Sequence, residues 1–561
     1  MSHLYEHLNQ PDGRWLRDIF LLSILFGFLF LAGLGSAPLI DPDEGRYAEI
    51  PREMLERGDF VTPTLNYVKY FEKPPFLYWL NAGSMQLFGQ HEWAARLPST
   101  LSGLLTVLLT YAAGRKLFDR KTALIAALIL GSSAGFLIQS RIILTDMLLT
   151  FCLSAALFCF LSATRCTDRK QQLFFQLFFI FSGLAVLAKG LIGIVLPGGI
   201  IFWYLLVSMR WQLLRQLPWF SGLLLFSTVT APWFILVSLK NPEFPHFFFI
   251  HEHFQRYTST IHQRSQPFWF FFPILILTMF PWSFFLPGSL KNAWHERHSS
   301  KGVTLFLLLW PLIIILFFSL SSSKLIPYIL PVFPPLTLLI AAFFVSQWRS
   351  RKGTGIRAPF LLISLLVMIL GICTTAVVIF PELWGHVQKN NLPVPKQLLL
   401  FSGIFFTAAG VLLLLGLRTR STTVIVTLLL LFGIAIELMF PKFYSDQIAE
   451  SLSSRKIAQA ALQHATPQTI LAQIGPNQGM NFYTRKRLMT VFILDELTFG
   501  SQQGDQRLWF PNFVDFVHLW KSDQHVLLVL PRSDIRNFAT VINTTPTIVL
   551  ETANQALLSN H

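Results

Sequence analysis

The chain has 561 residues and carries unusually little charge. Asp, Glu, Lys and Arg make up 13% of it, whereas soluble domains carry about 25%. Hydrophobic residues make up 53% of the chain, and its mean hydropathy is +0.53. This composition excludes an ordinary soluble protein and predicts an integral membrane protein.

Cysteine is scarce as well, and its positions exclude a CxxC motif. The four cysteines are Cys152, Cys159, Cys166 and Cys373. The first three recur every seven residues, as one stripe of a helix does, so we expect packing residues rather than a redox or zinc motif. Internal repeats and low-complexity segments are lacking too, which excludes a repeat architecture.

Long apolar runs dominate what is present. Each is near 20 residues, the length that an α-helix needs to cross about 30 Å of hydrocarbon, and the short alternating segments of a β-barrel are absent. The predicted fold class is an all-α polytopic membrane bundle of about thirteen transmembrane helices. The first run is too long for a signal peptide core, and Pro38 after "GSA" would block cleavage, so we expect a retained helix. The runs are centred near residues 28, 105, 130, 153, 180, 198, 228, 279, 311, 337, 370, 407 and 431.

The net charge of +15 is distributed by membrane side. With the N-terminus placed in the cytoplasm, the N-terminal tail and the loops on that side carry 20 Lys and Arg residues. The five shorter loops on the other side carry 8. This bias follows the positive-inside rule and predicts a cytoplasmic N-terminus and an exported C-terminus. It explains the basic charge better than binding to nucleic acid does.

The sequence predicts two domains. Residues 1–440 form the membrane domain, with outer loops at 40–93 and 240–267, and residues 441–561 form a soluble α/β domain on the outer face. In the second domain "TILAQIG", "RLMTVFIL", "HVLLVLP" and "TIVLE" are typical of short buried strands, with helices expected near 446–464 and 532–541.

Unusual polar residues gather on the predicted outer side, which is the side poor in Lys and Arg. Ionisable groups at the membrane edge are costly and indicate function. Cations there could bind phosphate, and carboxylates could act as a base or bind metal. Together they predict a lipid-phosphate substrate whose head group reacts in water. The residues are Asp43, Glu44, Arg46, Lys73, Asp146, Lys189, Arg256 and Lys324.

Each of these residues also has a structural interpretation that stays open. Asp43 and Glu44 could cap the helix expected over "EGRYAEIPREMLERG". Asp146 could pair with Arg141, and Lys324 could extend to the interface. Lys73 could be a solvated loop charge, Lys189 could be structural, and His251 and His253 could be packing residues. The convergence of all of them on one side favours function.

The motifs "DPDEGRYAEIPREML" and "YFEKPPFLYW" resemble the opening signature of bacterial aminoarabinose transferases. These enzymes resemble protein O-mannosyltransferases and belong to the GT-C class of membrane glycosyltransferases. The resemblance continues through "IILTDMLL", "LAKGLIG", "HEHFQRY", "QPFWFFFP", "SSSKLIPYILP" and "NFYTRKRLMTV…DELTFG", in order over nearly the whole chain. It implies a GT-C bundle with a small periplasmic α/β domain at the C-terminus.

The resemblance also implies an activity. Such enzymes transfer 4-amino-4-deoxy-L-arabinose from undecaprenyl phosphate to lipid A phosphate at the periplasmic face of the inner membrane, which gives polymyxin resistance. The implied partners are the lipid-linked sugar donor, a lipid A or other glycolipid acceptor and the bilayer. We expect no nucleic acid and a monomer.

Site roles follow from motif positions. The implied catalytic residues are Asp43, Asp146 and Glu44, and Asp41 is set aside because relatives can have an uncharged residue there. The implied substrate-binding residues are Arg46, Tyr47, Lys73, Lys189, Arg256, Lys324 and Tyr328. Glu72 and His253 could hold a divalent metal, Zn²⁺ or Mn²⁺, although two ligands do not make a site and no cofactor is certain.

Two other functions compete with this hypothesis. A GT-C transferase could move another polyprenyl-linked sugar to a different glycolipid or to protein. A lipid-linked sugar transporter would place charged groups along a path through the bundle and on both faces, which the one-sided clustering disfavours. A non-catalytic scaffold has no need for these charges at one membrane level.

Overall fold

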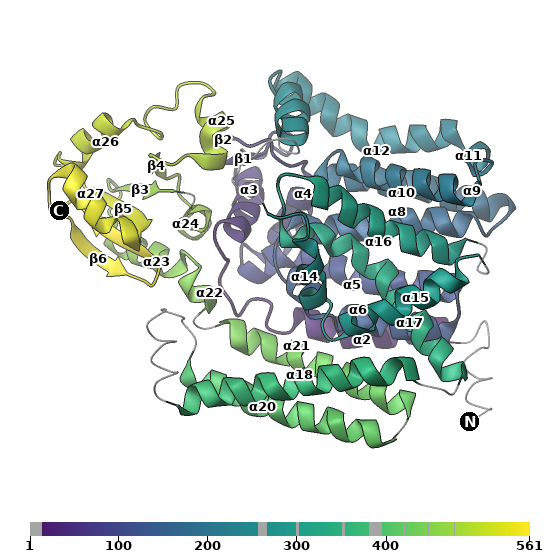
Figure 1. The fold of residues 1–561 in the computed structure, drawn as a ribbon. Coiled ribbons are helices and arrows are strands. Elements are labelled where there is room, and N and C mark those ends of the chain that lie inside the picture. Colours follow the sequence, from purple (N-terminus) through teal and green to yellow (C-terminus); the bar gives the residue numbers. More distant parts are fainter. Residues whose placement is uncertain are drawn as a thin grey trace.

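The computed structural model describes residues 14–255, 266–298, 302–350, 354–380, 395–419, 421–445, 448–475 and 477–561. Long helices lie side by side in a bundle, and an α/β domain stands at one end of it (Figure 1). The predicted fold class is thus confirmed.

Eight helical segments of the described chain are long and apolar enough to cross a membrane, or up to ten if each of two bent pairs is one span. The eight are α5 Glu92–Leu117, α8 Thr145–Ala163, α9 Asp168–Lys189, α12 Trp219–Lys240, α16 Val303–Leu320, η3 Ile326–Val332 continued by α17 Phe333–Ser350, α18 Thr354–Ile379 and α20 Lys396–Gly416. The pairs are α6 Arg120–Gly131 with α7 Ala134–Ser140, bent by 65°, and α14 Phe271–Thr278 with η2 Trp282–Phe285 and α15 Leu286–Glu296, bent by 111°.

Three further helices cover the remaining predicted runs. They are α2 Trp15–Leu31, α10 Ile192–Ser208 and α21 Thr422–Ser445. Every one of the thirteen apolar runs therefore falls on a helix or on a bent helix pair, while the number that crosses the membrane stays a prediction. The predicted boundary at 440 falls inside α21.

Helix α8 lies at the centre of the bundle, packed by α5, α9 and η3. Its apolar window is 94% buried, whereas those of α12 and α20 are 22% buried. A helix that is apolar all round and buried all round belongs to a core. The first residues of α8, among them Asp146, are therefore enclosed by neighbouring helices at one end of the bundle.

The first predicted outer loop folds into α3 Asp43–Arg57, a hairpin of β1 Thr64–Leu65 and β2 Val68–Lys69, and α4 Phe76–Phe88. Helix α3 ends at Gly58, whose φ of 64° is left-handed and suits glycine. This helix carries the predicted "EGRYAEIPREML" motif, and its residues from Glu44 to Met54 are buried.

The C-terminal domain contains a five-stranded sheet of order β4-β3-β5-β7-β6. The pairs β4–β3 and β3–β5 are parallel, and β5–β7 and β7–β6 are antiparallel. The four predicted strands are present as β3 Ile470–Ile474, β4 Met489–Val491, β5 Val526–Pro531 and β6 Thr547–Glu551, and β7 Gln555–Ser559 was not predicted. The helices are α22 Ile448–Ser451, α23 Arg455–His464, α24 Gln478–Thr484, α25 Thr498–Ser501, α26 Phe513–Trp520 and α27 Ile535–Ile542, with the 3-10 turns η5 Asp495–Leu497 and η6 Arg532–Asp534.

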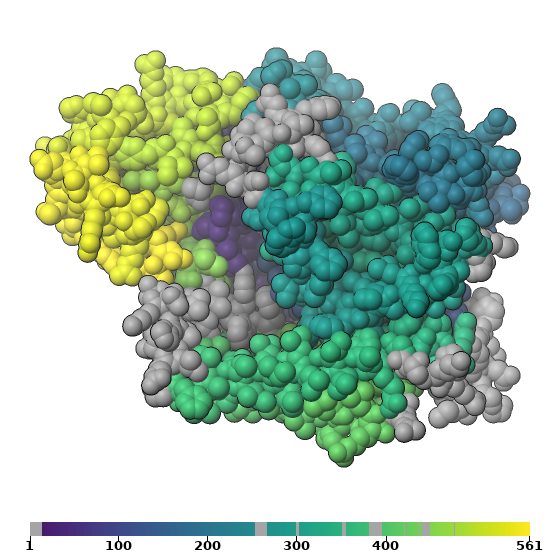
Figure 2. Space-filling view, viewed as in Figure 1, coloured from purple at the N-terminus to yellow at the C-terminus, as the bar shows by residue number. Residues whose placement is uncertain are grey.

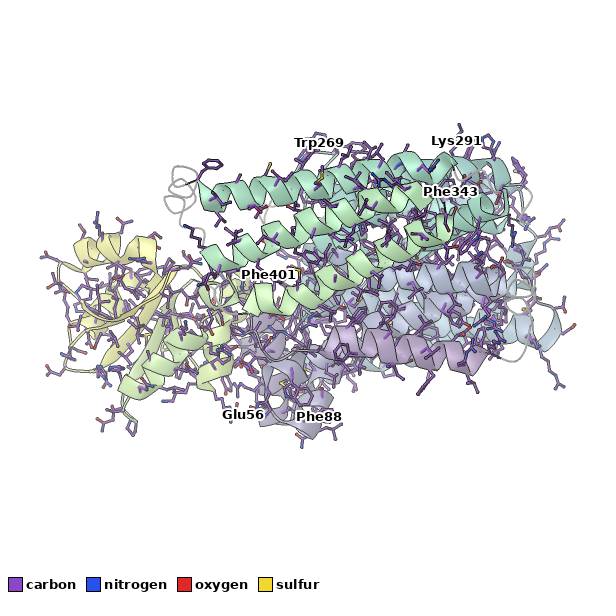
Figure 3. The ribbon with its side chains drawn as sticks, turned by 90° about the horizontal axis from the view of Figure 1, so that it is seen from below. Glu56, Phe88, Trp269, Lys291, Phe343 and Phe401 are labelled. Atoms are coloured by element: carbon purple, nitrogen blue, oxygen red, sulfur yellow. The ribbon has the colours of Figure 1, made fainter. Side chains whose placement is uncertain are left out.

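The two domains meet over α3. Helix α24 packs directly on α3, and Figure 2 shows the early part of the chain, in purple, at the bottom of a hollow between the yellow C-terminal domain and the bundle. In Figure 3 Glu56, Phe88 and Phe401 lie toward the domain's end of the bundle, while Lys291 and Phe343 lie toward the opposite end.

Candidate active site

The first group of site residues centres on Arg46 of α3. Its guanidinium pairs with Asp43 one turn earlier and with Glu496, which the C-terminal domain supplies from η5. The hydroxyl of Tyr70 accepts a hydrogen bond from Arg46 at 3.4 Å and donates one to Glu496 at 3.3 Å. Arg46 is 4% exposed, so this cation is shared by two domains and is fixed in place.

The second group surrounds Lys73. Its ammonium lies 3.6 Å from a carboxylate oxygen of Glu252 and 3.9 Å from one of Glu72, and it donates to the Glu72 carbonyl at 2.9 Å. The His251 Nδ1 atom lies 3.6 Å from Glu252. Glu252 comes from η1 His246–Gln255, so the two predicted outer loops meet at Lys73.

The third group joins α8, α9 and η3. Lys189 pairs with Asp146, and its ammonium lies 4.6 Å from the centre of the Tyr328 ring. Asp146 and Lys189 are 6% and 8% exposed. The alternative interpretation of Asp146 as the partner of Arg141 is replaced by this pair. Arg141 instead donates to the carbonyls of Leu29 and Ala32 at the end of α2.

The three groups lie close enough to act on common side chains. Tyr47 is buried against Tyr78, with ring centres 6.1 Å apart. Burial raises the pKa of the Tyr47 hydroxyl, the nearby charge of Arg46 opposes that rise, and the charges of Asp43, Glu72 and Asp146 add to it. The hydroxyl of Tyr47 is thus near enough to charges of all three groups to be affected by each of them. The structure brings together Asp43, Arg46, Tyr47, Glu72, Lys73, Asp146, Lys189 and Tyr328.

Exposure distinguishes the carboxylates of the site. The side chain of Asp43 is 54% exposed, whereas that of Asp146 is 8% exposed and that of Glu496 is 10% exposed. Those of Glu72 and Glu252 are 6% and 2% exposed. Asp43 is therefore the carboxylate of this set that a substrate can reach most readily.

Glu44, predicted to be catalytic, lies in a buried ion pair with Arg96, and its catalytic role stays a prediction. Its carboxylate accepts hydrogen bonds from the Arg96 guanidinium at 2.7 and 2.8 Å and from the Ile143 and Ile40 N–H groups at 3.1 Å. Glu44 is 1% exposed, and these donors bond to both oxygens of its carboxylate. The physical reason is that Arg96 enters the same buried space from α5, a position that the sequence did not connect with Glu44.

Asp41, which the sequence argument set aside, links the two domains. Its carboxylate accepts from the Ser454 hydroxyl at 2.6 Å, the Ser454 N–H at 3.0 Å and the Gly479 N–H at 2.5 Å. Burial raises the pKa of Asp41 to about 6, although these hydrogen bonds oppose the rise. Its role is docking of the C-terminal domain.

Lys324 lies between α16 and η3 and donates to the Ser321 carbonyl at 2.6 Å. It is 7% exposed, so its side chain is enclosed by protein. Burial lowers the pKa of its ammonium. Arg256 lies outside the described residues, as does the side chain of His253.

The donor chemistry around Glu72 does not make a metal site among the described residues. No group of three or more His, Cys, Asp and Glu side chains in the described parts of the chain is placed to hold a metal. The ammonium of Lys73 already lies near the carboxylates of Glu72 and Glu252. Pairing of Glu72 with His253 stays a prediction.

Sequence reasoning missed two carboxylates of the site. Glu252 lies in "HEHFQRY" and Glu496 in "DELTFG", and both stretches carried the family resemblance. The motifs were thus the available signal, but nothing in their spacing showed that these two acids would face Lys73 and Arg46.

Comparison with known proteins agrees with this geometry. A family model described as dolichyl-phosphate-mannose-protein mannosyltransferase matches residues 16–248, and one described as aminoarabinose transferase C-terminal domain matches residues 457–559. The fold and the site therefore define a membrane glycosyltransferase that uses a polyprenyl-phosphate sugar.

Individual relatives narrow the class. The undecaprenyl phosphate-α-4-amino-4-deoxy-L-arabinose arabinosyl transferase of Erwinia tasmaniensis is 31% identical over 539 residues, covering 93% of this chain and 94% of its own. That of Pectobacterium carotovorum is 37% identical over 341 residues, or 60% of each chain. The crystal structure of ArnT from Cupriavidus metallidurans bound to undecaprenyl phosphate has a TM-score of 0.82 at 30% identity, covering 97% of this chain and 98% of its own. The chain belongs to this family of aminoarabinose transferases and is a multi-pass protein of the bacterial inner membrane.

Proposed function

We propose that the protein transfers 4-amino-4-deoxy-L-arabinose from undecaprenyl phosphate to a phosphate of lipid A at the periplasmic face. The observation that carries the proposal is the meeting of buried cations with one accessible carboxylate, Asp43, at the outer end of the bundle. Membership in the arabinosyl transferase family supports the choice of donor and sugar.

In the proposed reaction an oxygen of the lipid A phosphate attacks the anomeric carbon of the sugar. A new carbon–oxygen bond forms there while the bond between that carbon and the donor phosphate oxygen breaks. The electron pair leaves with undecaprenyl phosphate, so negative charge grows on the leaving group. Lys73, Lys189 and Arg46 are the cations placed to stabilise it, because preorganised charge acts where charge develops.

The acceptor oxygen is already ionised near neutral pH, since the second pKa of a phosphate monoester is about 6. A general base is therefore unnecessary. Asp43 instead orients the acceptor or binds the ammonium of the amino sugar, and its contact with Arg46 sets its position.

The test uses Asp43→Asn and Lys73→Ala, with the exposed Lys521→Ala as the matched control. Lipid A from cells expressing each variant is measured by mass spectrometry, with protein amount checked in the membrane fraction. We expect loss of at least about 99% of the added aminopentose in the first two variants, because removal of one electrostatic stabiliser costs about 10²–10³-fold. Near-normal modification by both variants would overturn the site assignment.

The alternative is a GT-C transferase with another polyprenyl-phosphate sugar or another acceptor. The same mass spectra decide between them, since a gain of one aminopentose per phosphate is specific to the first function. Transfer by the purified protein with donor lipid excludes a transporter. We also infer that the chain acts as a monomer with its N-terminus in the cytoplasm and its C-terminal domain in the periplasm.

A further inference from the structure

A polar pocket of about 320 Å³ lies near the active site, with Lys69 of its lining next to Tyr70 in the chain. None of its lining residues belongs to the three groups described above. It is lined by Arg57, Asp59, Thr62, Thr64, Tyr67, Val68, Lys69, Lys240, Asn241, Gly500, Gln503 and Gln506.

Three separate parts of the chain build this pocket. Arg57 to Lys69 come from the end of α3 and the β1–β2 hairpin, and Lys240 and Asn241 come from the end of α12. The C-terminal domain supplies the rest, and it approaches closely: a Cβ added to Gly500 would lie 2.4 Å from the Lys69 carbonyl oxygen. The pocket therefore exists only while the C-terminal domain is docked.

The pocket lies at the membrane edge. Lys240 is the last residue of α12, one of the apolar helices long enough to span the bilayer, and its ammonium donates to Asp59 at 2.7 Å. Lipid head groups lie at the level where a span ends. A head group can therefore reach the pocket without leaving the membrane.

The charge of the lining is positive. Arg57, Lys69 and Lys240 face a single lining carboxylate, Asp59, while Glu243, beside the pocket, pairs with Lys69. The side chains of Arg57 and Lys69 are each 33% exposed, and that of Lys240 is 54% exposed, so a ligand can contact them. Asn241, Gln503 and Gln506 contribute amide groups. Cations with neutral donors are the chemistry that binds a phosphate.

The pocket and the catalytic site share two pieces of backbone. Lys69 of β2 lines the pocket, and the next residue, Tyr70, contacts Arg46. Successive residues in extended backbone point to opposite sides. On the other side of the contact, Glu496 of the catalytic site is followed four residues later by Gly500 of the pocket. The pocket and the active site therefore lie on opposite sides of the same short stretch of backbone.

We propose that this pocket binds a second phosphate on the head group of the acceptor glycolipid, apart from the phosphate that receives the sugar. The inference rests on the proposed function and makes the C-terminal domain part of acceptor recognition. It predicts a preference for acceptors that carry two phosphates.

The test compares a bisphosphorylated lipid A with its monophosphorylated analogue, using the purified full-length protein and donor lipid. Lys69→Gln, Lys240→Gln and Gln503→Glu each remove or oppose positive charge in the pocket, and Lys521→Gln is the control. We expect each pocket variant to raise KM for the bisphosphorylated acceptor about tenfold, with kcat and the KM for the monophosphorylated acceptor unchanged. Lys69→Arg, which keeps the charge, is expected to restore the KM.

The outcomes separate the two proposals. No transfer by the wild type to either acceptor contradicts the proposed function itself. Equal KM values for both acceptors in the wild type, or KM changes of the same size for both acceptors in the variants, overturn the pocket proposal alone. A further experiment titrates inorganic phosphate as an inhibitor of transfer. If the pocket binds free phosphate, phosphate will inhibit the pocket variants less than the wild type while the KM for the acceptor stays the same. That result also overturns the pocket proposal. Gln503→Glu keeps the test valid if a lysine variant fails to fold.

Discussion

Two neighbouring acids on α3 lie in contrasting surroundings. The side chain of Asp43 is 54% exposed at the site, while Glu44 is 1% exposed and bonded to Arg96. The sequence predicted that acids lie at this point and that helix capping was a competing interpretation. Glu44 does accept from the Ile40 N–H, as a residue near a helix start can. The exposure of each acid could not be predicted, because it depends on Arg96, which lies 52 residues further along the chain.

Replacing these two neighbours should therefore separate stability from activity. Glu44→Ala leaves Arg96 buried without its partner, and breaking such a pair costs about 3–5 kcal/mol. We expect a clearly lower midpoint of thermal unfolding in detergent for Glu44→Ala. Asp43→Asn should keep the midpoint of the wild type while losing sugar transfer. A Glu44→Ala protein as stable as the wild type would contradict the structural role.

The pair of Asp146 and Lys189 allows a similar separation. Both groups are buried where α8 and α9 meet the site, so Asp146→Leu alone should destabilise the protein by leaving a buried cation. The double variant Asp146→Leu with Lys189→Met replaces the pair by apolar groups, which is often neutral for stability. We expect the double variant to recover the thermal midpoint but not the transfer activity. Recovered activity would show that the pair is only structural.

At the scale of elements, the long periodic segments were predictable and the short ones were not. All thirteen apolar runs form helices or bent helix pairs. In an apolar segment of membrane length, the backbone N–H and C=O groups can form hydrogen bonds only with one another. Strand β7 was missed although it lies between β5 and β6, since its apolar core "ALL" is too short to show a strand period. Its place is set by pairing with β5, a contact that no local pattern encodes.

The contact of Asp41 with α23 and α24 should make domain docking depend on pH. Burial raises the pKa of Asp41 from 3.8 to about 6, so the folded chain binds this proton more tightly than the unfolded chain. The resulting stabilisation is complete below the unfolded pKa and is lost as the pH rises through about 6. We expect the thermal midpoint of the wild type to fall more steeply between about pH 4 and pH 6 than that of Asp41→Asn. Equal slopes would contradict the raised pKa.

At the scale of the whole molecule, the sequence predicted an α/β domain beside the membrane bundle but not its contribution to the site. The C-terminal domain places Glu496 on Arg46 and receives the Asn66 side chain from the β1–β2 hairpin. These contacts join residues more than 400 positions apart. Their geometry follows from the packing of two folded units, which composition and periodicity do not describe.

Asn66 gives the sharpest test of this coupling between the domains. The residue is fully buried. Its side chain donates to the Leu488 carbonyl at 2.8 Å and accepts from the Leu488 N–H and the Asn481 amide at 2.9 Å. At about 1 kcal/mol for each hydrogen bond, Asn66→Ala should weaken docking by about 3 kcal/mol while leaving the membrane bundle intact. We expect faster protease cleavage between α21 and α23 together with a transfer rate reduced about tenfold, because Arg46 then loses the partner that positions it.

The control for this prediction is Asn554→Ala, which removes an exposed hydrogen bond to the Ser451 carbonyl. It should leave both cleavage and transfer near the wild-type values. If Asn66→Ala releases the C-terminal domain to protease while transfer continues at the normal rate, the membrane domain alone holds Arg46 in its active position. The C-terminal domain would then be a neighbour of the site and not a part of it. If the loss of transfer instead increases in proportion to cleavage, the reaction requires the docked C-terminal domain. Undocking separates Glu496 from Arg46 without changing any residue of the membrane domain.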